Sequence, residues 1–127
     1  MSEAVYFCRM EILEMDEMRR QWGELLRVLE RQFGEKPNLN ALLFLIGVQE
    51  LGQGHKKFTK DEKQDLMHIA TCKLLSFWGY YSLDGKDEEG WPQWKAEQEL
   101  PRLTLGEQER LLRQSAILYF RENNLEF

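Results

Sequence analysis

The chain has 127 residues, 43% of them hydrophobic, which suits a single domain over residues 1–127 with a core that needs neither metals nor disulfides. Its formal net charge of −5 counts against nucleic acid and anionic membranes as main partners. The two cysteines, Cys8 and Cys72, form no disulfide framework, and the longest apolar run is far too short to cross a bilayer. We therefore expect a soluble cytoplasmic protein.

Residues 3–33 carry the apolar stripe of a bundle helix. Met15, Trp22 and Leu29 recur at seven-residue spacing, and Glu and Arg fill the other face. Gly34 follows the last apolar residue, as is common at a helix C-terminus. The sequence therefore predicts one long amphipathic helix over this segment.

Residues 39–51 predict a second helix that is surrounded on most sides. Asn38 suits its N-cap, and the segment has almost no polar face. Gly47 in its interior costs roughly 1 kcal/mol of helix stability relative to Ala, so we expect another helix to come close at this point.

Two further helices begin with capping boxes, in which a Thr is followed three residues later by a Glu. These boxes are Thr59–Glu62 and Thr104–Glu107. The apolar spacing predicts that the first helix continues to about Tyr81 and that the second continues to about Asn123.

The connection between these two helices, residues 82–103, is long and acidic. Pro92 suits the first position of a short helix over about 92–98, and Pro101 would end it. The sequence thus predicts an all-α fold, an antiparallel bundle of four main helices with this connection between the third and the fourth. In such a bundle, the acidic connection and the basic loop after residue 51 lie at opposite ends.

The acidic connection also supplies the predicted binding residues. Two tryptophans lie beside a run of acids, a combination that suits a protein partner with a basic surface. The candidate partner-binding residues are Trp91, Trp94, Asp87, Glu88 and Glu89. For the two indoles themselves, the favoured interpretation is structural, namely that both fold down to cover the end of the bundle. The preferred function is a non-enzymatic protein-interaction or regulatory module, and self-association into a homo-oligomer stays open.

Asp65, His68 and Cys72 form the main alternative, a small enzyme or ligand-binding bundle. They lie three and four residues apart, on one side of a predicted helix. Metal sites need three or four ligands, and a di-iron bundle needs two carboxylate–histidine motifs, of which this chain has only one. We therefore expect no metal and no cofactor, and we assign no catalytic residue.

A third hypothesis is weak nucleic-acid or anion binding at the start of the third helix. The lysines in question are Lys56, Lys57, Lys60 and Lys63. The neighbouring acids nearly balance their charge, so a solvated loop is the favoured interpretation and nucleic acid is not the expected partner.

Overall fold

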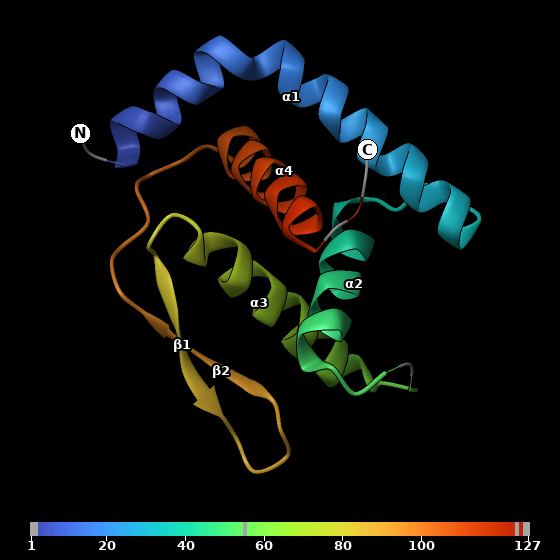
Figure 1. Ribbon diagram of the computed structural model, residues 1–127. Coiled ribbons are helices and arrows are strands. Elements are labelled where there is room, and N and C mark those ends of the chain that lie inside the picture. The colour runs from blue at the N-terminus through green and yellow to red at the C-terminus, as the bar shows by residue number, and fades with distance from the viewer. Residues whose placement is uncertain (1–2, 55, 124, 126–127) are drawn as a thin grey trace. The chain divides into compact units, whose positions relative to one another are not determined.

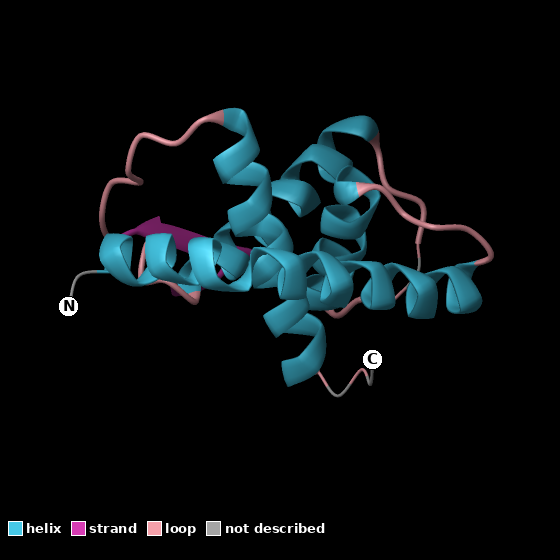
Figure 2. Cartoon of the chain, turned by 90° about the horizontal axis from the view of Figure 1, so that it is seen from above, coloured by secondary structure: helices cyan, strands magenta, loops and turns pink. Residues whose placement is uncertain are grey.

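The computed structural model describes residues 3–54, 56–123 and 125, and describes side chains from residue 16 onward. Its elements, in order, are α1 (Glu3–Phe33), α2 (Leu39–Leu51), α3 (Lys60–Ser76), β1 (Tyr81–Lys86), β2 (Pro92–Ala96) and α4 (Leu105–Glu122). Figure 1 shows that β1 and β2 form a β-hairpin, and Figure 2 shows strands, in magenta, in addition to the helices. The fold is therefore mixed α/β, and the predicted all-α bundle is wrong. The side chains of Cys8 and Met15 lie outside the described residues.

The helix signals read from the sequence are confirmed. α1 and α2 have the predicted bounds, and the Asn38 side chain accepts a hydrogen bond from the backbone N–H of Ala41 at 2.8 Å. The capping boxes of Thr59 and Thr104 are both formed, each with reciprocal bonds to its Glu. Local side-chain chemistry thus fixes where these helices begin.

α3 ends five residues earlier than predicted. Gly79 has φ 83°, a left-handed conformation that an L side chain rarely adopts, and the Tyr80 N–H turns back to the Leu75 carbonyl at 3.3 Å. Because the chain reverses here, the predicted last turn of the helix is replaced by the start of β1 at Tyr81.

The acidic connection contains an antiparallel hairpin instead of the predicted short helix. Tyr81 pairs with Ala96, and Lys86 pairs with Pro92, across a bulge. Asp87 shapes the turn, because its carboxylate accepts from the backbone N–H groups of Glu89 and Trp91 at 3.0 and 2.8 Å. Proline is tolerated at the first residue of a strand, where Pro92 lies.

By their contacts, the described residues form two compact units. The first joins the residues up to Lys36 with those from Pro101 onward, so that α4 packs on α1. The guanidinium carbon of Arg113 on α4 lies 5.5 Å from the ring centroid of Trp22 on α1. Leu25 of α1 and Tyr119 of α4 are almost completely buried.

The second unit, Pro37–Leu100, contains α2, α3 and the hairpin. α3 contacts both α2 and the two strands (Figure 1). The predicted close approach at Gly47 is confirmed, because a Cβ atom there would lie 2.2 Å from the carbonyl oxygen of Leu66 on α3. Leu42, Ile46 and Leu66 are fully buried. No helix among the described residues is long and apolar enough to span a membrane.

The predicted separation of the acidic and basic loops is wrong. The hairpin folds back along α3, so its turn lies beside the loop that follows α2 (Figure 1). The side-chain amide of Gln53 donates to the Glu89 carbonyl at 2.8 Å, and the rings of Phe58 and Trp91 meet edge to face at 6.4 Å. The acidic turn and the lysine-bearing loop are therefore neighbours.

Candidate functional site

A pocket of about 400 Å³ lies between α3 and the hairpin, within the unit Pro37–Leu100. It is lined by Glu62, Asp65, His68, Ile69, Asp87, Glu89, Trp91, Pro92, Gln93 and Trp94. The structure thus brings together residues that the sequence analysis had assigned to two competing sites. Asp65 and His68 came from the enzyme hypothesis, and the acids and tryptophans of the hairpin came from the partner-binding hypothesis.

The α3 wall follows from helical spacing. Glu62, Asp65 and Ile69 recur every three or four residues and therefore lie along one face of α3, with His68 next to them. Ile69 is 5% exposed and belongs to the core side of the helix, whereas Asp65 and His68 are exposed. This wall therefore changes from apolar to acidic across its width.

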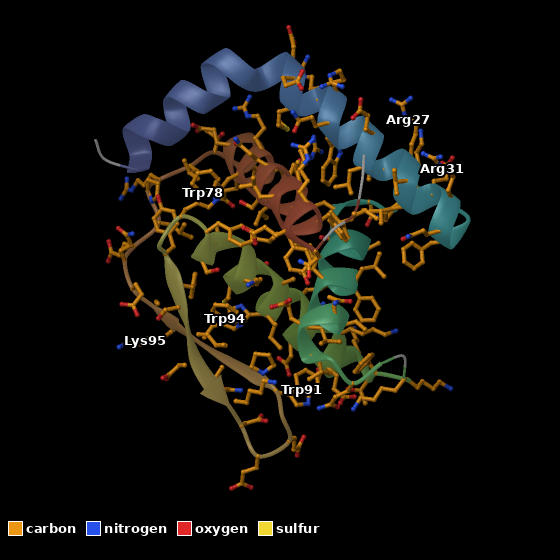
Figure 3. The ribbon with its side chains drawn as sticks, viewed as in Figure 1. Arg27, Arg31, Trp78, Trp91, Trp94 and Lys95 are labelled. Atoms are coloured by element: carbon orange, nitrogen blue, oxygen red, sulfur yellow. The ribbon has the colours of Figure 1, made fainter. Side chains whose placement is uncertain are left out.

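Trp94 lies on the opposite wall, in β2. Successive strand residues point to opposite faces, and Figure 3 shows Trp94 between β2 and α3 while Lys95 points away from the helix. The indole is partly buried, and among the described residues its buried Nε1 atom has no hydrogen-bond partner. Trp94 therefore supplies a large aromatic surface to the pocket.

Trp91 combines a pocket wall with a role in packing. Its side chain packs against the buried cluster of Leu51, Phe58 and Leu66, and it also lines the pocket. Through this packing, the indole attaches the hairpin to α2 and α3. The indole is only partly buried, so part of its surface stays accessible in the pocket. Trp91 thus packs on a buried cluster of α2 and α3 instead of covering the end of a bundle, and its role in binding a partner stays a prediction.

The pocket is strongly acidic. Four carboxylates line it against no lysine or arginine, which gives a formal charge of −4 with His68 neutral. The Glu62 carboxylate is held by the Thr59 N–H at 2.8 Å, and Asp87 by the two turn N–H groups described above. The carboxylates of Asp65 and Glu89 have no hydrogen-bond partner among the described residues and lie exposed.

Cys72 lies close to His68 but outside the pocket. Its Sγ atom is 3.5 Å from Nε2 of His68, yet the residue is fully buried and absent from the pocket lining. Burial raises the pKa of the thiol to about 11, so it stays protonated near neutral pH, where a nucleophile would need the thiolate. The pocket therefore includes Asp65 and His68 of that hypothesis without Cys72.

The remaining predicted residues lie elsewhere. Glu88 is exposed on the turn and does not line the pocket, although Asp87 and Glu89 on either side of it do. The four lysines of the anion hypothesis are also exposed and outside the pocket, and Lys56 donates to the Gln53 side chain at 2.7 Å. Across the part of the chain that the structure describes, no group of three or more His, Cys, Asp or Glu side chains is placed to hold a metal ion.

Sequence reasoning missed four of the lining residues, namely Glu62, Ile69, Pro92 and Gln93. Glu62 was noticed only as a capping residue, although its spacing places it on the same helix face as Asp65. Gln93 could be found only by recognising β2, because its role depends on the hairpin lying along α3.

No protein-family model matches this chain, and neither a curated protein nor a solved structure shows a significant similarity to it. The geometry and charge of the pocket are therefore the basis for assigning a function.

Proposed function

We propose that the chain is a non-enzymatic protein-interaction module whose pocket binds a basic side chain on the surface of a partner protein. One observation carries the proposal. The walls present four carboxylates and two indoles, and no lysine or arginine among the lining residues neutralises them. A cation is the ligand that such a surface attracts, and a phosphate-bearing ligand would be repelled.

The carboxylates and the indoles make different contributions to binding. Carboxylates that line a cleft raise the local concentration of a cationic partner and the association rate. The indoles of Trp91 and Trp94 give a cation both apolar contact and the attraction of an aromatic ring, which slow its dissociation. Because the acids come from α3 and from the hairpin, a bound cation would contact both elements.

The test uses short peptides that carry a single basic residue, titrated into the ¹⁵N-labelled chain and followed by NMR. We expect shifts in the indole N–H signal of Trp94 and in the amide signals of the lining residues. Asp65→Asn and Glu89→Gln should each weaken binding by about fivefold, corresponding to roughly 1 kcal/mol for a partly exposed charge pair. Both changes preserve side-chain size.

A matched control variant is available on α3 and another on the hairpin turn. Asp61→Asn and Glu88→Gln remove the same charge from exposed positions that do not line the pocket. At physiological salt their effect should be smaller, because neither carboxylate lines the pocket to contact a cation bound in it. Equal weakening by lining and control variants would reduce the effect to net charge and contradict the proposed pocket, as would tighter binding of a single-stranded oligonucleotide than of any peptide.

A further inference from the structure

We infer that the basic group for which this pocket is shaped is the guanidinium of an arginine side chain, in preference to the ammonium of a lysine. The inference rests on the proposed function and adds the chemical class of the ligand. It follows from how the carboxylates are held and from what the opposite walls are made of.

Two of the four carboxylates are fixed before any ligand arrives, one on each wall. Glu62 of α3 is held through Oε1 by the Thr59 N–H, and Asp87 of the turn is held through Oδ1 by two backbone N–H groups. The second oxygen of each has no partner among the described residues. These acceptors have therefore already lost the side-chain freedom that binding would otherwise cost.

Acceptors that are fixed on two separate elements suit a donor that can bond in several directions at once. A guanidinium is planar and carries five N–H groups around its edge, so it can bond to carboxylates on more than one side. An ammonium has three donors on a compact head, and its stronger hydration makes it costly to bring against an apolar wall. The pocket has such walls in Ile69 and Trp94.

The aromatic groups are arranged in a way that disfavours a methylated ammonium. Quaternary ammonium groups are held in cages of aromatic rings. Here both indoles belong to the hairpin, whereas α3 contributes two carboxylates, His68 and Ile69 to the lining but no Phe, Tyr or Trp ring. The faces of a guanidinium can contact an indole of the hairpin while its edge reaches carboxylates of α3 and of the turn.

The experiment compares three blocked peptides that differ only in a central Arg, Lys or trimethyllysine, titrated against the full chain by NMR at fixed salt. We expect the Arg peptide to bind about tenfold more tightly than the Lys peptide. Glu62→Gln and Asp87→Asn should reduce this ratio toward one. Gln and Asn can still accept the backbone bonds at a capping box and at an Asp-type turn, so the fold is retained and an unchanged melting temperature verifies it.

The possible outcomes distinguish a failure of the arginine preference from a failure of the proposed function on which it rests. Equal binding of the Arg and Lys peptides would overturn the arginine preference and leave the basic-partner proposal standing. Tightest binding of the trimethyllysine peptide would also overturn it, in favour of an aromatic cage. Failure of all three peptides to bind would overturn both. Glu88→Gln serves as the control that should leave the Arg-to-Lys ratio unchanged, since Glu88 lies outside the pocket.

Discussion

Gly47 is the position where the packing of α2 on α3 can be tested most sharply. A Cβ atom there would lie 2.2 Å from the carbonyl oxygen of Leu66, 2.7 Å from its carbonyl carbon and 2.9 Å from its Cβ. These are mostly backbone atoms inside a helix, so no change of rotamer removes the clash. Gly47→Ala therefore forces α2 and α3 apart.

The magnitude follows from two opposing terms. Replacing an interior helical glycine by alanine stabilises a helix by about 1 kcal/mol. Against this, ordinary van der Waals contact begins at 3.4 Å, so the Leu66 oxygen must move from 2.2 Å to that distance. Overpacking of a close-packed interior costs roughly 1–3 kcal/mol, and more where backbone must shift. We expect a net loss of about 2 kcal/mol, or roughly 8 °C in melting temperature.

Urea unfolding followed by circular dichroism at 222 nm measures the change in the free energy of unfolding, with Gly23→Ala as the matched control. Gly23 lies inside α1, and a Cβ atom at that position would meet only a flexible Arg27 guanidinium nitrogen at 3.9 Å, so alanine should stabilise there by up to about 1 kcal/mol. If residues 1–127 unfold as one domain, both variants move the same single transition in opposite directions. A Gly47→Ala variant as stable as the wild type would refute the close approach of α2 and α3.

Three further predictions concern the stability of the fold and the reactivity of Cys72. Trp91→Ala should lower stability by about 2–3 kcal/mol because the indole packs on the Leu51–Phe58–Leu66 cluster, whereas Trp91→Phe should cost less; equal melting temperatures for the two variants would contradict that packing. In a Cys8→Ser background, Cys72 should react slowly with a thiol reagent at pH 8 until urea is added, and rapid labelling of the folded chain would contradict its burial. Because the native thiol keeps its proton to about pH 11 and the unfolded thiol loses it near pH 9, stability should fall by roughly 2 kcal/mol as pH rises through this window, and Cys72→Ala should remove that part of the fall.

The helices could be predicted because their signals are local. The Asn38 cap and the two Thr–Glu capping boxes use side chains within three residues of the helix start, and the structure has all three. The close contact at Gly47 could also be predicted, because a glycine inside a helix costs stability and its presence there indicates that another element comes close. The long apolar spacing of α1 gave its bounds in the same way.

The hairpin could not be predicted with the same means. β1 and β2 have only six and five residues and include Asp, Gly, Pro, Lys and Ala, which are poor strand formers. Their stability comes from pairing with each other and from docking along α3. Prediction of the site failed for the same reason. Asp65, His68 and Trp94 were each noticed, but the pocket that contains all three depends on a contact between α3 and a hairpin that the sequence analysis had taken for a loop with a short helix.

The docking of the hairpin has a thermodynamic consequence for any ligand of the pocket. A two-stranded sheet is marginally stable by itself in water, so β1 and β2 persist through their contacts with α3. One wall of the pocket therefore belongs to an element that can open without unfolding the helices, at a lower free energy than global unfolding. A ligand that contacts both walls binds only the docked form. Its binding must raise the free energy of hairpin opening by an amount set by its concentration and affinity, so amide hydrogen exchange in β2 would report occupancy of the pocket even for a ligand with no signal of its own.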